Sequence, residues 1–150
     1  MSIDKENDKT VQVFVYGSLR KGMQNHYRLE EMGAKYMGYF KTNKTYYMVG
    51  LKSRAYPYIT ESQVSPDSLK TYITGEIYTI NLSSLDHLDV LEGSPHNYIR
   101  RLEYFNGPKI TSAYMYILEN TELIDGIKKN FEKRFVNVPG GDWVAFNKDI

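Results

Sequence analysis

The strongest structural signal in the chain is the run Val11-Gln12-Val13-Phe14-Val15-Tyr16, which stops at Gly17. Its residues are mostly β-branched or aromatic and almost continuously apolar, which is typical of a strand buried on both faces. A turn bounded by glycines follows as far as Gly22, and residues 25–32 have helical composition and end at Gly33. We therefore expect the ordered chain to open with a buried strand, a turn and a short helix.

Most of the remaining chain has the composition of strands, which we predict over residues 34–42, 45–49, 56–59, 70–80, 98–105 and 110–118. Asn43-Lys44 is expected to be a turn between the first two of these strands. Asn106-Gly107-Pro108 is expected to be the turn of a hairpin between the last two. Pro57 lacks the N–H group that a central strand must donate, so its strand is expected at a sheet edge.

Two further helices are predicted. Residues 82–91 carry a leucine at every third position, and Gly93 followed by Pro95 ends that helix. The second helix is expected over residues 122–135, and Pro139-Gly140-Gly141 is expected to begin an irregular tail. Strands dominate, with few helices between them, which favours an α+β fold with a curved or barrel-like sheet over a doubly wound parallel sheet.

Length and composition limit the possible functions. The chain of 150 residues contains 19 lysines and arginines against 18 aspartates and glutamates, so neither nucleic acid nor an anionic membrane is an expected partner. It contains no cysteine, which excludes disulfides, thiolate metal sites and a cysteine nucleophile. No apolar run approaches the ~20 residues of a membrane helix. We expect a cytoplasmic protein with a solvated, disordered tail over residues 1–10 and a single domain over residues 11–150.

Two familiar catalytic motifs can be compared with the turn after the first strand. The glycines at positions 17 and 22 have the spacing of a phosphate-binding loop, but the lysine and hydroxyl that reach phosphate and magnesium are missing. Ser18 is a possible nucleophile with His26, His87 or His96 as its base. Its surroundings do not match the G-x-S-x-G pattern of serine hydrolases, and the three histidines are not spaced as a metal site.

The same turn has a simpler use as a main-chain binding site. Gly17 lets a ligand approach the backbone closely, and successive N–H groups in such a turn can converge on an anion or a carbonyl oxygen. An ordinary strand-to-loop turn explains these residues equally well.

Glu92 is the carboxylate we single out. It lies in the last turn of the helix predicted over residues 82–91, where the helix dipole presents partial negative charge. Burial there would raise its pKa toward the range in which a general acid and base works near neutral pH. An exposed glutamate at a helix end is common, however, and the spacing alone favours that interpretation.

Several segments together resemble the γ-glutamylcyclotransferase-like superfamily, in particular its γ-glutamylamine cyclotransferases and small bacterial AIG2-like members. The matching segments are Val13-Phe14-Val15-Tyr16-Gly17-Ser18-Leu19-Arg20-Lys21-Gly22 with Asn25-His26, Thr74-Gly75-Glu76-Ile77-Tyr78, Leu88-Asp89-Val90-Leu91-Glu92-Gly93 with Tyr98-Ile99-Arg100, Ala113-Tyr114-Met115-Tyr116, and Gly141-Asp142-Trp143. They span residues 13–143. The opening motif and the Leu-Asp-x-x-Glu element are quite specific as a pair.

The resemblance implies an α+β fold built on a small mixed β-barrel, with a few peripheral helices and a ligand cavity at the barrel mouth. It also implies that Glu92 is the catalytic acid and base and that Tyr98 and Tyr116 line the pocket. The Tyr16-Gly17-Ser18-Leu19 turn would hold the γ-glutamyl group through its backbone. The implied substrate is a small γ-glutamylamine or γ-glutamyl amino acid, and the residues do not distinguish a monomer from a homodimer.

The implied reaction needs no metal or cofactor. The substrate's own α-amine attacks its γ-carbonyl carbon, which closes a lactam, 5-oxoproline, and expels a free amine. Glu92 would take a proton from the attacking amine and return one to the leaving amine. Two alternatives remain open: a binding module for glutamyl or 5-oxoproline-like ligands without turnover, and a serine hydrolase that uses Ser18.

Overall fold

The computed structural model describes residues 9–53, 56–92 and 98–148. Its strands are β1 (Thr10–Val15), β2 (Lys35–Leu51), β3 (Pro57–Thr60), β4 (Thr71–Asn81), β5 (Tyr98–Asn106), β6 (Thr111–Leu118) and β7 (Phe135–Asn137). Its helices are α2 (His26–Glu31), α3 (Leu82–Glu92), α4 (Thr121–Lys129) and α5 (Trp143–Lys148), with short 3₁₀ turns at Asp67–Leu69 and Pro139–Gly141. None of the helices in these three ranges is long and apolar enough to cross a membrane.

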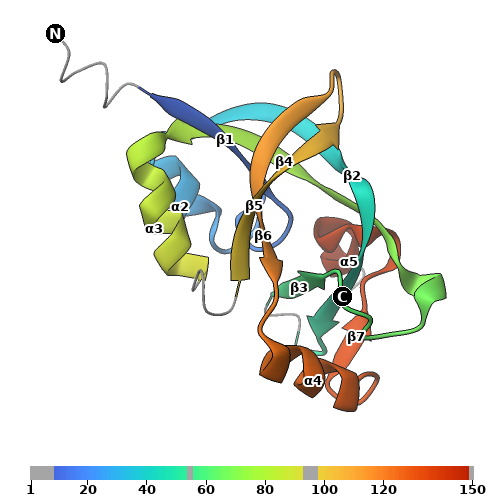
Figure 1. Ribbon diagram of the computed structural model, residues 1–150. Coiled ribbons are helices and arrows are strands. Elements are labelled where there is room, and N and C mark those ends of the chain that lie inside the picture. Colours follow the sequence, from blue (N-terminus) through green and yellow to red (C-terminus); the bar gives the residue numbers. More distant parts are fainter. Residues whose placement is uncertain (1–8, 54–55, 93–97, 149–150) are drawn as a thin grey trace, which may run out of the picture.

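Five strands close into a mixed barrel, as the sequence predicted. The strands are hydrogen-bonded in the order β2-β4-β1-β6-β5, and β5 pairs back onto β2 to complete the ring. β1 and β6 run parallel, with Val13 opposite Tyr114, whereas the other neighbours in the ring are antiparallel. α2 and α3 lie together against one side of the barrel, and α4, α5, β3 and β7 gather toward the other end (Figure 1).

β3 and β7 extend β2 beyond the barrel. β3 pairs with Tyr47 to Gly50 of β2, and β7 pairs with Val49 to Leu51. β3 stands at the end of the strand order, so the edge position expected from Pro57 is confirmed.

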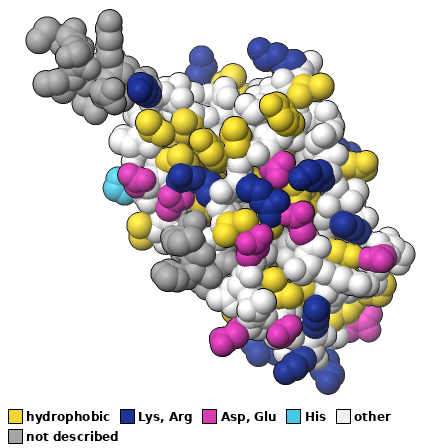
Figure 2. Space-filling view, viewed as in Figure 1, with side chains coloured by type: hydrophobic (Ala, Val, Ile, Leu, Met, Phe, Trp, Pro, Cys, Tyr) yellow, Lys and Arg dark blue, Asp and Glu magenta, His cyan; other side chains and the backbone are white. Residues whose placement is uncertain are grey.

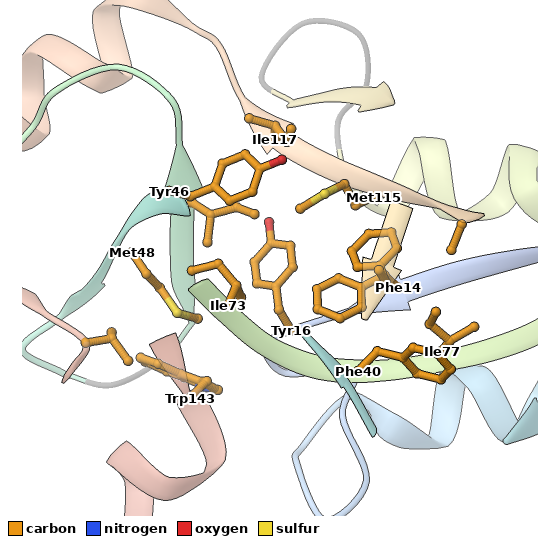
Figure 3. Close-up of a cluster of buried hydrophobic side chains, with 14 residues drawn as sticks. Phe14, Tyr16, Phe40, Tyr46, Met48, Ile73, Ile77, Met115, Ile117 and Trp143 are labelled. Carbon is orange, nitrogen blue, oxygen red and sulfur yellow. The ribbon is translucent and has the colours of Figure 1, made fainter. Parts of the chain in front are cut away.

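The barrel interior is filled with aromatic and aliphatic side chains (Figure 3). Phe14 and Phe105 stack with ring centroids 4.3 Å apart, and both are almost fully buried. Gly75 of β4 makes room for this packing, since a Cβ atom there would lie 2.3 Å from the carbonyl oxygen of Val15 and 2.6 Å from the Phe14 ring. The side chains of this cluster come from β1, β2, β3, β4, β5 and β6 and from the C-terminal segment, so the core ties the barrel strands to the tail.

The turn predicted at Asn43-Lys44 is wrong, because β2 is one strand of 17 residues. Its pairing with β4 shifts register between Lys41 and Thr45. Buried Thr42 stabilises this irregularity: its hydroxyl donates to the Lys44 carbonyl at 2.6 Å and accepts from the Ile73 N–H at 2.9 Å. The polar residues that suggested a turn form a bulge that bends the long strand.

The helix predicted over residues 122–135 is too long. α4 ends at Lys129, where the Asn130 side chain donates to the Gly126 carbonyl at 2.7 Å and Glu132 takes a left-handed φ of 71°. Phe135 and the two residues after it instead pair with β2 as β7. The pairing of residues 135–137 with β2 thus excludes a helix as long as the one predicted.

The tail is more regular than predicted, since α5 occupies Trp143–Lys148. The Asp142 carboxylate caps α5 by accepting the Ala145 N–H at 3.1 Å. Trp143 is fully buried against Gly50, where an added Cβ would lie 2.6 Å from the indole ring. A single tryptophan with a capping aspartate is a weak signal in sequence, which explains why this helix was missed.

Two other predictions need adjustment. α3 runs through Glu92, and Leu85 and Leu88 are buried while Leu82 and Leu91 are about 40% exposed. A three-residue spacing drifts around the helix, so the outer leucines leave the buried face. β1 begins at Thr10, within the predicted tail. The remaining tail, residues 1–8, lies outside the described residues, as do Gly93, Pro95 and His96.

Candidate active site

A cavity of about 510 Å³ lies where the end of β1 meets the last turn of α3. Every residue predicted for the site lines it: Tyr16, Gly17, Ser18, Leu19, Glu92, Tyr98 and Tyr116. Asn25, Tyr56, Pro57, Tyr58, Leu88, Val90, Leu91 and Leu123 contribute to the same lining. The structure therefore brings the turn after the first strand and the carboxylate of α3 to one space, although they are more than 70 residues apart in sequence.

The turn after β1 is held by its carbonyl groups. The Gly17 carbonyl accepts the Arg20 N–H at 3.0 Å, and the Ser18 carbonyl accepts the Asn25 N–H at 2.9 Å. Among the residues that the structure describes, the N–H groups of Ser18 and Leu19 have no hydrogen-bond acceptor. We call Gly17, Ser18 and Leu19 the main-chain cradle, because their backbone is fixed while these donors remain available to a ligand.

Packing against Pro57 requires glycine at position 17. A Cβ atom there would lie 2.8 Å from the Pro57 ring, closer than real contacts allow. Pro57 belongs to β3, which thus packs directly against the cradle. Gly17 allows that close approach, which a side chain would prevent.

Glu92 is the last residue of α3, and its side chain is partly buried in the cavity wall. Burial raises the pKa of its carboxyl group from 4.5 to about 7, because the ionised form loses its hydration. Among the described lining residues, Glu92 is the sole carboxyl group and no lysine or arginine is present. A carboxyl group with such a pKa can both accept and donate a proton near neutral pH.

A second carboxylate stands one helical turn before Glu92. Asp89 accepts a hydrogen bond of 2.6 Å from the Tyr116 hydroxyl and pairs with the Arg100 guanidinium. Burial and the hydrogen bond to Asp89 raise the pKa of Tyr116 well above its usual value, so this hydroxyl stays protonated. Asp89 therefore fixes Tyr116 in the cavity wall. Asp89 was not among the predicted site residues, although its spacing of three residues from Glu92 places both on one side of the helix.

The predicted tyrosines do not share one role. Tyr16 is 9% exposed, and its ring stands in the middle of the core cluster in Figure 3. Its hydroxyl donates to the Tyr116 carbonyl at 2.7 Å, so only part of this residue reaches the cavity. Tyr98 lies farther out and stacks on Tyr58, with ring centroids 6.4 Å apart and an interplanar angle of 5°. Tyr56 packs against Tyr58 in turn, which builds an aromatic wall.

Within the described part of the chain, the Ser18 hydroxyl is paired with an amide and not with a histidine. Its hydroxyl accepts a hydrogen bond of 2.9 Å from the Asn25 side chain. The Nδ1 atom of His26 is bonded to the Leu19 carbonyl at 2.9 Å, and His87 is exposed on α3. No described histidine is hydrogen-bonded to Ser18, and the third, His96, lies outside the described residues. Asn25, which in the sequence is visible only as part of the opening motif, orients this serine.

On the face shown in Figure 2, basic and acidic side chains are interspersed. Arg101, for example, pairs with Glu61, Glu103 and Glu119. Within the described part of the chain, no three His, Cys, Asp or Glu side chains are grouped to hold a metal ion.

Known proteins resemble this chain along most of its length. The model of the family described as "Gamma-glutamyl cyclotransferase, AIG2-like" matches residues 13–145. "Gamma-glutamylaminecyclotransferase C" of Danio rerio is 31% identical over 150 aligned positions, covering 93% of this chain and 90% of that protein. A Vibrio cholerae protein named "Putative gamma-glutamylcyclotransferase" is 30% identical over 131 positions, covering 87% of this chain and 93% of its own.

Solved structures share the fold. A mouse AIG2-like protein superposes with a TM-score of 0.61 at 23% identity, covering 72% of this chain and 76% of that one. A uropathogenic E. coli-specific protein gives a TM-score of 0.63 at 15% identity, covering 95% of this chain and 98% of its own. At these identities the likenesses concern the fold alone. Together with the family match over residues 13–145, they confirm the resemblance seen in the sequence: the chain belongs to the γ-glutamylcyclotransferase, AIG2-like family.

Proposed function

We propose that the protein is an enzyme that cleaves a γ-glutamyl amide by intramolecular cyclisation and releases 5-oxoproline and a free amine. The observation that carries this proposal is the placement of Glu92, with a pKa of about 7, in the same cavity as the main-chain cradle. Family membership supports the reaction class, and the names of the Danio rerio relatives support a γ-glutamylamine as substrate.

The chemistry requires a proton to move between two nitrogen atoms of the substrate. The α-amine, with a pKa near ~8, is largely an ammonium group at neutral pH and must lose a proton before it attacks. Once that proton has passed to solvent, the free amine attacks, and ionised Glu92 takes a second proton from its nitrogen as the N–C bond of the lactam forms. Protonated Glu92 then gives it to the leaving nitrogen as the original amide C–N bond breaks. One bond forms and one breaks, no water is consumed, and Glu92 returns to its starting state.

The cradle would act on the carbonyl oxygen. As the amine attacks, negative charge develops on that oxygen, and the N–H groups of Ser18 and Leu19 are donors without an acceptor among the described residues. One such donor contributes about 3–4 kcal/mol of transition-state stabilisation in acyl-transfer enzymes. The cavity would also hold the glutamyl arm curled, and proximity of this kind can lower the barrier of a cyclisation by roughly 7–11 kcal/mol.

The aromatic wall would accommodate the rest of the substrate. Tyr56, Tyr58 and Tyr98 offer ring faces and edges. Such surfaces suit an alkyl chain or an amine cation, through apolar contact or attraction to the ring face. We therefore place the leaving amine against these rings.

The experiment is incubation of the purified protein with γ-glutamyl amines and γ-glutamyl amino acids in water enriched in ¹⁸O, followed by mass spectrometry. Cyclisation predicts 5-oxoproline without ¹⁸O, because no water oxygen enters the product. Hydrolysis, including a route through Ser18, would release glutamate that carries one ¹⁸O atom. Labelled glutamate as the main product would replace this proposal with a hydrolase. Tight binding of 5-oxoproline with no product from any substrate would leave a binding module.

A further inference from the structure

The residue directly after the cradle, Arg20, is buried and doubly paired. Its guanidinium is 2% exposed and donates from Nε to Glu76 of β4 at 2.8 Å and from Nη1 to Asp142 at 2.8 Å. Removing a guanidinium from water is costly unless its hydrogen bonds and its charge are compensated. The two carboxylates provide this compensation, and they come from segments 56 and 122 residues away along the chain.

The Glu76 carboxylate binds the end of the turn at two points, the side chain of Arg20 and the backbone N–H of Lys21. It is 1% exposed, and its second carboxylate oxygen accepts the Lys21 N–H at 2.9 Å and the Tyr78 hydroxyl at 2.8 Å. Both Arg20 and Lys21 are therefore fixed to the same carboxylate on β4. The Arg20 N–H also closes the turn onto the Gly17 carbonyl, so a displacement of Arg20 would move the cradle amides.

Asp142, whose side chain is 32% exposed, is held by the residues on either side of it in the C-terminal segment. Gly141 before it has a φ of +64°, and a Cβ there would lie 2.2 Å from the Tyr72 carbonyl oxygen. Trp143 after it is fully buried. One carboxylate oxygen of Asp142 accepts both the Arg20 guanidinium and the Ala145 N–H that begins α5. The Gly-Asp-Trp motif thus connects the C-terminal segment to the cradle.

We propose that Arg20, Glu76 and Asp142 are positioning residues for the reaction, and that the C-terminal segment holds the main-chain cradle in its productive geometry through Asp142 and Arg20. None of the three residues needs to touch the substrate to do so. This inference rests on the proposed function for its kinetic consequence. Its structural consequence, the ordering of residues 17–21, is independent of any activity.

The test uses Asp142→Asn, which keeps an amide oxygen able to cap α5 but removes the charge that faces Arg20. Asp142→Ala removes both. Asp125→Asn is the matched control, because Asp125 is an exposed aspartate on α4 with no hydrogen bond to the cradle. Each protein is studied as the full chain by amide hydrogen exchange of Arg20 and Lys21 and by 5-oxoproline release.

For Asp142→Asn we expect about tenfold faster exchange of the Arg20 and Lys21 amides, with exchange in β5 and β6 unchanged. We also expect a kcat about tenfold lower with KM within about threefold, since small misplacements of catalytic groups act mainly on the transition state. Asp142→Ala should show larger losses of both kinds, and Asp125→Asn should match the wild type.

Exchange and kcat equal to the wild type in both Asp142 variants would overturn the proposal. Faster exchange spread evenly over the barrel would also overturn it, because that result indicates a general loss of stability. If the wild-type protein turns over no γ-glutamyl substrate, the proposed function fails, and the exchange of Arg20 and Lys21 alone decides whether the tail positions the cradle.

Discussion

The raised pKa of Glu92 makes a prediction about stability that is independent of catalysis. Folding buries this carboxyl group and moves its pKa from 4.5 to about 7. Between these values the folded protein keeps the proton while the unfolded chain releases it. Protonated Glu92 therefore contributes stability to the folded protein that is fully present below pH 4.5. This contribution to the free energy of unfolding is lost as the pH rises toward 7.

The size of the effect follows from the shift. One pKa unit corresponds to 1.36 kcal/mol, so the stability lost when Glu92 ionises in the folded protein amounts to about 3 kcal/mol. Glu92→Gln has no proton to release and avoids the loss. We expect the free energy of unfolding of Glu92→Gln, relative to wild type, to rise by about 3 kcal/mol between pH 4 and pH 8.

Urea denaturation of both proteins at intervals from pH 4 to pH 8 measures this difference. Glu30→Gln serves as a matched control, because Glu30 is an exposed glutamate on α2. A flat curve for Glu92→Gln, or one that falls as the pH rises, would refute the argument that burial holds the proton on Glu92.

Three other substitutions test neighbouring parts of the site. Gly17→Ala places a methyl group 2.8 Å from the Pro57 ring. We expect 5-oxoproline release to fall by about 10²-fold, as for other small displacements of catalytic groups, and activity within threefold of wild type would contradict the close approach. Tyr116→Phe removes the hydrogen bond to Asp89 and should lower the free energy of unfolding by about 1–3 kcal/mol in urea, whereas no change would mean that this bond contributes nothing. Ser18→Ala should reduce turnover by less than about tenfold, because the role proposed for Ser18 uses its main-chain N–H group. Abolished turnover, together with labelling of the wild type by a fluorophosphonate probe, would instead indicate a serine nucleophile.

Much of the fold could be predicted from local patterns. The buried strand before Gly17, the helix that ends at Glu92 and the edge position of Pro57 depend on neighbouring residues, and the structure confirms them. The bulge at Thr42 could not be predicted in this way. It depends on a hydrogen bond to Ile73, a residue 31 positions away, and a local pattern carries no information about such a partner.

The candidate site depended more on the resemblance than on periodicity. Spacing alone favoured an exposed Glu92, because its burial depends on how α3 packs against β1, β4 and β6, which a local pattern does not reveal. The role of Asp89 was missed for the same reason, since its partners Tyr116 and Arg100 lie on strands that follow α3. The C-terminal anchor at Asp142 was visible only as a motif until the structure placed Arg20 beside it.

The central claim is that Glu92 moves protons for a glutamyl arm held in the main-chain cradle, and one comparison tests it most directly. The kcat for 5-oxoproline release is measured at pH 7 for the wild type and for Glu92→Gln, with binding of 5-oxoproline measured in parallel. We predict a kcat lower by about 10²–10⁴-fold with binding retained. A Glu92→Gln protein that binds 5-oxoproline and turns over within threefold of the wild type would contradict the account.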